Sequence, residues 1–264
     1  MTALRYGVLD TWTLAQRSIV RALADPRLLL PQLAFPIMFV LLYGYVFGSG
    51  MTVPGGGDYV EFLMPGLFVQ MMAFGLVGTM SEVAADAQRG ITDRFRVLPI
   101  SAAAVVLGRG LADMLSAVVV LAIMLVVGLL MGWEWHGGAL DAAAAFGLLL
   151  LLRFALVWVG IYLGLVARSP EAASGLFLLA FPVTMITSAF VAPELMPDWL
   201  GAVAEWNPLS ATITATRTLF DNPGQPAGGA WPTGHAALVA ILGPALLTAV
   251  FLPLSARRYR RMSR

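Results

Sequence analysis

The sequence predicts an all-α integral membrane protein, because apolar residues dominate it and gather in long stretches. Of its 264 residues, 59% are hydrophobic and only 12% are charged, against roughly 45–50% apolar and about 25% charged in an ordinary soluble domain. A water-soluble protein of this composition would have to expose large apolar patches. About 20 apolar residues cross a bilayer as a helix, so the long apolar stretches are candidate spans.

Six stretches are long enough to span a membrane. Windows without Asp, Glu or Arg locate five of them, because an unpaired charge in hydrocarbon is costly. These windows are 28–57, 62–81, 114–133, 172–193 and 222–256. The sixth stretch, 142–167, contains one charge, Arg153, with eleven uncharged residues before it and fourteen after it. We therefore expect a transmembrane domain of six helices over residues 28–256, followed by a basic cytoplasmic tail, 257–264.

The arginines indicate how the spans are oriented. If both termini are cytoplasmic, every arginine except Arg153 and Arg217 falls in an inner segment. The outer segments 49–61 and 133–141 contain acidic residues and no arginine. Cytoplasmic loops of membrane proteins carry an excess of positive charge. We therefore expect a multi-pass protein with both termini inside, and the bacterial inner membrane is the simplest setting for it.

Residues 1–27 predict a separate element on the cytoplasmic side. Charged residues throughout this segment leave no apolar core for a signal peptide. Leu9, Trp12, Ile19 and Leu23 fall near one face of a helix, which is typical of an amphipathic helix that lies on a membrane surface. An Asp-Pro pair then stops the pattern. The alternative is that this helix extends the first span.

Two absent residue types restrict the possible functions. All 16 basic residues are arginine, so the chain lacks the lysine that Walker-type ATP sites and Schiff bases require. Cysteine is absent as well, which excludes disulfides, thiolate nucleophiles and cysteine-ligated metals. The net charge of +1 argues against a nucleic-acid partner. We therefore expect no catalytic, metal or cofactor site in this chain.

The cytoplasmic loop 83–100 has the pattern of a docking element. A helix can run to Gln88, Gly90 can make a turn, and Pro99 can end a short second helix. The second helix carries Phe95 among charged residues, so it can insert an apolar side chain into a groove of a partner. The alternative is an ordinary inner loop that holds arginines because of its position.

The outer connection 193–221 predicts two short helices. Pro197 and Asp198 can start the first, and Asn207 with Pro208 ends it. The second, from Ser210 to Phe220, is too short to cross a bilayer. The segment therefore predicts a helix pair between spans five and six.

Three segments of the chain resemble a known family. They are QRGITDRFRVLPI at 88–100, GGGDYVEFLMPGLFVQ at 55–70 and NPLSATITATRTLF at 207–220. These segments resemble the type 2 ABC exporter permeases, most closely the membrane subunits of the daunorubicin-resistance subfamily. The resemblance extends over essentially the whole chain. Its motifs are specific for the superfamily and not for the transported substrate.

The resemblance implies a permease subunit of an ATP-driven exporter that moves an amphiphilic drug-like or lipid-like molecule out of the cell. A separate ATPase subunit would hold ATP and Mg and would bind the coupling loop 83–100. Permeases of this family work in pairs, so the other partners implied are a second permease copy, identical or related, and membrane lipids. The residues implied at the ATPase contact are Arg89, Gly90, Asp93, Arg94, Phe95 and Arg96.

Further residues are candidates for the transport path and for its outer lid. Spans two and five would supply the wall between two copies, since methionine and aromatic side chains suit apolar cargo of variable shape. The candidate path residues are Phe68, Met71, Met72, Phe74, Phe181, Met185 and Phe190. The outer helix pair would dip into the outer leaflet as a re-entrant lid that includes Trp199, Trp206, Asn207 and Pro208. The alternatives are lipid contact or core packing for the first set and two surface helices for the second.

Arg153 is the one charge far from both ends of its span, roughly 18 Å along the helix from Asp141. It either lines the path, where it would favour anionic or zwitterionic cargo, or forms a structural tether with an acid. Asp113 is the acid that a neighbouring span can bring to it. Arg109, four residues away on the same helix, can instead pair with Asp113.

Other functions compete with this one. The same family also includes exporters of lipid-linked glycans and other components of the cell envelope. A membrane-embedded enzyme would need clustered carboxylates, a Ser–His pair or a metal site, and an ion-driven transporter would place acids within its spans. Neither pattern is visible in the sequence.

Overall fold

The computed structural model describes residues 26–48, 53, 56–89, 102–167, 169–225 and 230–261. Every element within these ranges is a helix, which confirms the predicted all-α class. The expected amphipathic helix over residues 1–27 lies outside the described residues, apart from its last two positions. Most of the coupling loop, from residue 90 to residue 100, lies outside them as well.

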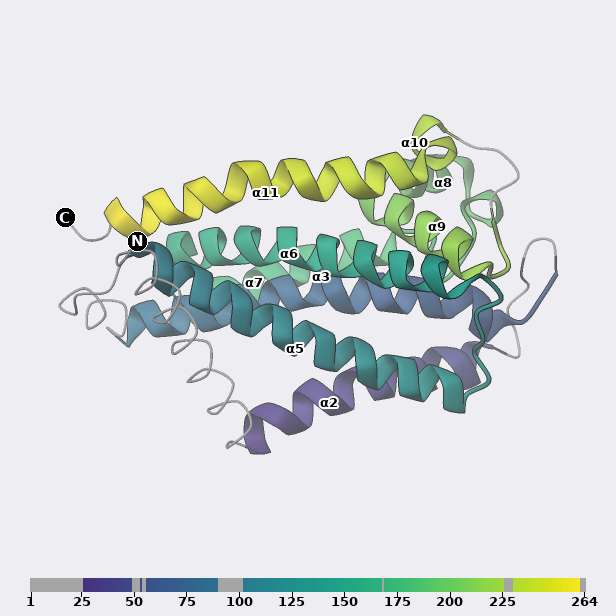
Figure 1. Ribbon diagram of the computed structural model, residues 1–264, viewed down its shortest axis with the longest axis horizontal. Helices are drawn as coiled ribbons and strands as arrows, with labels where there is room; N and C mark the ends of the chain where they lie inside the picture. Colours follow the sequence, from purple (N-terminus) through teal and green to yellow (C-terminus); the bar gives the residue numbers. More distant parts are fainter. Residues whose placement is uncertain are drawn as a thin grey trace.

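The long helical segments lie lengthwise along the molecule (Figure 1). They are α2 (Pro26–Leu41) with the π-helix η1 (Leu42–Phe47), α3 (Tyr59–Gln88), α5 (Ala102–Leu130), α6 (Ala139–Ala167), α7 (Pro170–Met185) and α11 (Ala236–Arg261). Short helices gather at the end of the molecule where α11 begins (Figure 1). They are η2 (Pro193–Leu195), α8 (Asp198–Trp206), α9 (Pro208–Phe220) and α10 (Trp231–Gly234).

The long helices alternate in direction. α3, α6 and α11 end, and α5 begins, at the end of the molecule opposite to the short helices (Figure 1). Arg89 directly follows α3, and the last turns of α11 carry Arg257 and Arg258. These arginines therefore share one end of the bundle, which agrees with the alternation expected from the arginine distribution.

Four helices among the described residues have the length and composition of a membrane span. They are Tyr59–Gln88, Leu107–Leu130, Ala139–Ala167 and Ala236–Tyr259. The expected windows 28–57 and 172–193 overlap α2 and α7, which have 16 residues each. A helix of that length rises about 24 Å, which is less than the hydrocarbon thickness of a bilayer.

The prediction of one continuous span over 172–193 is wrong at its outer end. α7 ends at Met185, one turn after Pro182, and the chain then turns without helix as far as η2. The end of a helix leaves carbonyl groups without intrahelical donors. The Asn207 side chain donates to two such groups, the carbonyls of Val183 and Ile186, at 2.8 and 2.9 Å. The helix thus ends early because a distant amide stabilises the break.

Two glycines of α6 allow α3 to approach closely. A β-carbon at Gly160 would lie 2.9 Å from the carbonyl oxygen of Leu76, and one at Gly164 would lie 2.7 Å from that of Met80. Glycines four residues apart are the pattern by which membrane helices pack backbone against backbone. The pair therefore places α6 directly against α3, the helix that leads to the coupling loop.

Candidate functional site

Aromatic side chains meet where α2, α3 and α7 come together. Phe35 and Phe39 of α2 contact Phe74 of α3, with ring centroids 5.9 and 6.0 Å apart. The Phe74 ring lies parallel to that of Phe181 on α7, at 6.2 Å and with 6° between the planes. Phe74 is 9% exposed and Phe181 is 38% exposed. The group therefore extends from the interior of the chain to its surface.

The aromatic group continues toward the short helices. Tyr43 of η1 stacks on Phe190 at 4.3 Å, and its hydroxyl donates to the sulfur of Met185 at 3.9 Å. We define the aromatic strip as Phe35, Phe39, Tyr43, Phe74, Phe181, Met185 and Phe190. Four of these, from Phe74 onward, are predicted path residues that the structure brings together. The other three were not predicted from the sequence, although their spacing of four places them on one helical face.

The remaining predicted path residues, Phe68, Met71 and Met72, lie in the core of the chain. Their side chains are at most 5% exposed. Phe68 packs edge-on against Trp133 and Phe146, with ring centroids 5.4 and 5.8 Å apart. Side chains of the same chain surround these three residues in this conformation, so their burial stabilises the bundle.

A buried polar network joins three helices around Arg153 of α6. Arg153 Nη2 donates to the hydroxyl of Thr79 at 3.0 Å, and that hydroxyl donates to Asp113 Oδ2 at 2.7 Å. Arg153 Nη2 also lies 4.0 Å from the same carboxylate oxygen. Arg153 is 6% exposed, and a β-carbon at Gly75 would collide with its guanidinium group. The network therefore links α3, α5 and α6 in the interior of the bundle.

Arg109 forms a second ionic cluster at the end of α3. Its guanidinium donates to Asp86 at 2.9 Å and also to Glu82. These two acids are one helical turn apart, so they reach Arg109 from one face of α3. The arrangement in which Arg109 bonds to Asp113 of its own helix is therefore not the one in the structure. The cluster connects the last turns of α3, where the predicted coupling loop 83–100 begins, to α5.

One of the residues expected at the ATPase contact is described. Arg89 is exposed and caps α3, and its backbone N–H donates to the carbonyl of Ala85. The end of α3 at Gln88 agrees with the helix end predicted from the sequence. The other expected contact residues lie outside the described residues: Gly90, Asp93, Arg94, Phe95 and Arg96.

α8 and α9 are the two short helices predicted within 193–221, and the break between them lies at Asn207 and Pro208. Trp199 and Trp206 of α8 are 71% and 65% exposed. Asn207 is buried, and its side chain accepts a hydrogen bond from the Leu209 N–H at 3.0 Å, which caps α9. Pro208 occupies the first position of α9, where its missing N–H costs nothing.

Arg217, which the arginine distribution leaves in an outer segment, is buried in α9 at 2% exposure. Its Nη2 donates to the carbonyls of Phe62 on α3 and Ser188 after α7, at 2.9 and 3.0 Å. The guanidinium carbon also lies 4.0 Å from the centre of the Phe62 ring. Desolvation lowers the pKa of Arg217 to about 9, which leaves it charged at neutral pH. This role was not predicted from the sequence, although a lone arginine among small and hydroxyl residues is a visible signal of it.

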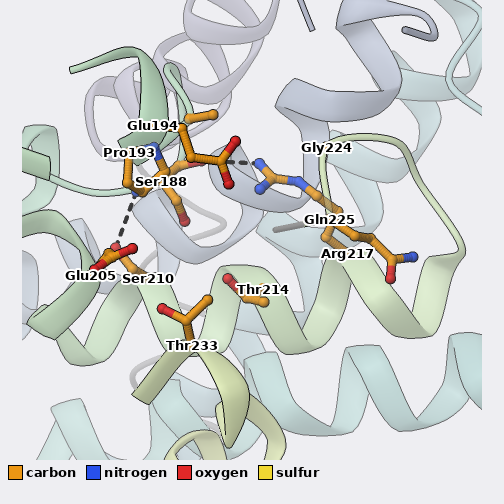
Figure 2. A pocket seen from close by; sticks show the side chains of 11 residues that line it. Ser188, Pro193, Glu194, Glu205, Ser210, Thr214, Arg217, Gly224, Gln225 and Thr233 are labelled. Atoms are coloured by element: carbon orange, nitrogen blue, oxygen red, sulfur yellow. Dashed lines mark hydrogen bonds between the residues drawn. The ribbon is translucent and has the colours of Figure 1, made fainter. Parts of the chain in front are cut away.

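Figure 2 shows Arg217 pointing toward Ser188 across a small pocket. Thr214 and Ser210, about one and two turns before Arg217 on α9, line the same pocket. Glu194 of η2 and Glu205 of α8 line it as well. The cavity measures about 20 Å³, which is room for a water molecule and too little for an organic cargo.

Comparison with known proteins decides the family. Residues 10–220 match the family described as ABC-2 type transporter. The chain is also 36% identical over 226 residues to the daunorubicin resistance ABC transporter permease protein DrrB1 of Streptomyces coeruleorubidus, which covers 85% of this chain and 77% of that protein. The chain belongs to the ABC-2 type transporter family.

More distant ABC-2 relatives have similar descriptions. The probable doxorubicin resistance ABC transporter permease protein DrrC of Mycobacterium tuberculosis is 24% identical over 220 residues, 81% of this chain and 78% of that protein. The putative transport permease ycf38 of Cyanophora paradoxa is 23% identical over 222 residues, 82% of this chain and 76% of that protein. As an ABC-2 permease, the chain is the multi-pass transmembrane subunit of an ABC exporter and not an enzyme. ATP hydrolysis takes place on a separate subunit.

Proposed function

We propose that this permease moves amphiphilic molecules with flat aromatic rings out of the cell, along the aromatic strip. The strip carries the proposal, because stacked aromatic rings and a thioether favour planar apolar cargo. Phe181 of the strip is already parallel to Phe74 and 38% exposed, so a planar cargo can contact the exposed part of its ring. The names of two relatives refer to resistance to daunorubicin and doxorubicin, which supports this class of cargo.

The proposed transporter contains two permeases in the bacterial inner membrane. Each permease contributes six spans, with α2 plus η1 and α7 as the two shorter ones, and both termini lie in the cytoplasm. Leu178, one turn before Phe181 on the same face of α7, is 78% exposed, which leaves this side of the strip open to a second copy. The lid formed by α8 and α9 lies at the outer leaflet, with Trp199 and Trp206 at the interface.

The proposed energy source is the separate ATPase, which binds ATP and Mg. It contacts the segment from Arg89 to Arg96. α3 precedes this segment directly, and it also carries Phe74 of the aromatic strip. The cluster of Arg109 with Glu82 and Asp86 ties the same end of α3 to α5. A displacement of the coupling loop therefore moves the helices around the strip. This movement shifts the population between inward-open and outward-open forms.

The experiment that tests this function is ATP-dependent uptake of daunorubicin into inside-out membrane vesicles. The vesicles contain the permease together with its own ATPase, and the control has an ATPase with an inactivated Walker lysine. We expect uptake that requires ATP, the active ATPase and the permease. Equal daunorubicin uptake in the presence and absence of ATP would contradict the proposal.

A further inference from the structure

Three buried side chains of α9 and its cap bond to the outer ends of two other helices. Arg217 donates to the carbonyls of Phe62 on α3 and Ser188 after α7, at 2.9 and 3.0 Å. The Ser210 hydroxyl accepts from the Ser188 N–H at 3.1 Å (Figure 2). Asn207 donates to two carbonyls at the end of α7, at 2.8 and 2.9 Å. We call Asn207, Ser210 and Arg217 the outer clamp, because they hold α3 and α7 together at one end of the bundle.

The bonds of the outer clamp lie at breaks in both helices. Pro65 is inside α3, one turn after Phe62, and a proline within a helix removes one intrahelical hydrogen bond and favours a kink. Pro182 is in the last turn of α7, and the helix ends at Met185. Breaks of this kind are positions about which helices bend. The clamp therefore holds two helices at the points where their outer ends can move.

The same two helices carry the parallel pair of the aromatic strip, Phe74 and Phe181. A cargo that moves along the strip reaches the clamp at its outer end, where Phe190 of the strip lies two residues after Ser188. While the clamp is closed, the pocket beside it is only about 20 Å³. A pocket of this size admits no organic cargo, so cargo that leaves at this point requires the clamp to open.

The clamp is also built in a way that allows release. Within the described residues, Arg217 bonds to neutral carbonyls, and no carboxylate lies within ion-pair distance of it. Its Nε and the Ser188 hydroxyl have no hydrogen-bond partner in the same part of the chain. Glu194 and Glu205 line the pocket beside Arg217, so they are available as alternative partners for the guanidinium. The arginine therefore has two possible sets of partners, as a two-state element requires.

We infer that the outer clamp is the outer gate of this permease: Arg217 positions α3 against the chain after α7 in the closed state and releases it when cargo leaves. The inference rests on the proposed export function and adds the residues that close its exit. Arg217 is a positioning residue in this account, because it acts through Phe62 and Ser188 and not by binding cargo.

The absence of cysteine from the chain permits a direct test. Ser188→Cys places one thiol at a position that is 4% exposed beside the clamp. A membrane-impermeant maleimide is added outside proteoliposomes that contain the permease and its ATPase, and labelling of the permease is followed by mass. Thr218→Cys, at an exposed position of α9, is the control for reagent access. Ala145→Cys, at a fully buried position of α6, is the control for general unfolding.

Without nucleotide, we expect Arg217→Gln to increase the labelling rate at position 188 at least about tenfold, with no change at positions 145 and 218. Arg217→Lys keeps the charge and one bond, so the increase should be smaller. In the permease with native Arg217, ATP turnover should also accelerate labelling at position 188. Unchanged labelling there in Arg217→Gln or during turnover would overturn the inference, as would equal acceleration at position 145. The nucleotide-free arm involves no cargo, so its failure is distinguishable from a failure of daunorubicin uptake.

Discussion

Arg153 of α6 and Asp113 of α5 lie 4.0 Å apart in the interior of the bundle, and the hydroxyl of Thr79 on α3 bonds to both. Arg109 pairs with Glu82 and Asp86 near the end of α3, and Asp113 pairs with Arg153 instead. A charge in hydrocarbon is stabilised by pairing of this kind. The geometry favours a structural tether over a cargo-binding role for Arg153. Its guanidinium contacts Thr79 and Asp113, and the residue is only 6% exposed.

The tether predicts a specific pattern of stabilities. Asp113→Ala leaves Arg153 buried without its acid, and removal of one partner of a buried pair costs about 3–5 kcal/mol. The double variant Arg153→Leu with Asp113→Leu removes both charges, so it should recover most of this loss. Thermal unfolding of the purified permease in detergent measures both. A double variant as unstable as Asp113→Ala would show that the pair is not a tether.

The glycine pair of α6 leaves no room for an added methyl group, so we expect a substitution by alanine to push α3 and α6 apart. A β-carbon at Gly164 would lie 2.7 Å from both the Met80 carbonyl and the Val83 side chain. We expect Gly164→Ala to destabilise the permease by about 1–3 kcal/mol, the usual cost of overpacking. Gly147 of the same helix has nothing within 4 Å of its β-carbon position, so Gly147→Ala is the matched control and should be neutral or slightly stabilising. Equal stability of the two variants would argue against close α3–α6 packing.

Exposure predicts which aromatic side chains act on cargo. Phe181→Ala removes a partly exposed ring of the strip, and we expect it to raise the daunorubicin concentration for half-maximal uptake about fivefold, since an aromatic pair is worth roughly 0.5–1.5 kcal/mol. Phe68→Ala should instead destabilise the fold by about 3–5 kcal/mol, because this ring is fully buried. Uptake kinetics and thermal unfolding of both variants separate the two roles. A lower stability but unchanged half-maximal concentration in Phe181→Ala would assign it to packing.

We expect the ATPase to bind the segment from Arg89 to Arg96 of the coupling loop. Arg94→Ala combined with Phe95→Ala removes a charge and the apolar side chain that is expected to enter the partner's groove. We expect this variant to be inserted normally but to lose co-purification with the ATPase. Arg257→Ala, at an exposed position near the end of α11, is the control that keeps binding. Retained co-purification of the double variant would place the contact elsewhere.

Local signals in the sequence were sufficient for part of this structure. The composition predicts the all-α membrane class. Asn207, which can cap a helix, and Pro208, which lacks an N–H, predict where α8 ends and α9 begins. Gln88 is the predicted and the observed end of α3. Each of these features depends on residues within a few positions of one another.

Features that depend on distant contacts were not predicted. The early end of α7 requires Asn207, which bonds to its carbonyls from another helix. The burial of Arg217 requires acceptors on α3 and after α7. Phe68 and Phe74 belong to one apolar helix, look equivalent in the sequence and are both buried. Phe68 packs against Trp133 and Phe146, whereas Phe74 contacts the rings of α2. Only the packing of neighbouring helices distinguishes them.

Photolabelling tests directly whether cargo moves along the aromatic strip. A photoreactive daunorubicin analogue is added to the permease with its ATPase during ATP turnover, and the labelled peptides are mapped by mass spectrometry. We predict labels within residues 35–43, around Phe74 and within 181–190, which an excess of unmodified daunorubicin removes. Labels that this competition removes only from the exposed apolar residues of α5 and α11 would contradict the claim.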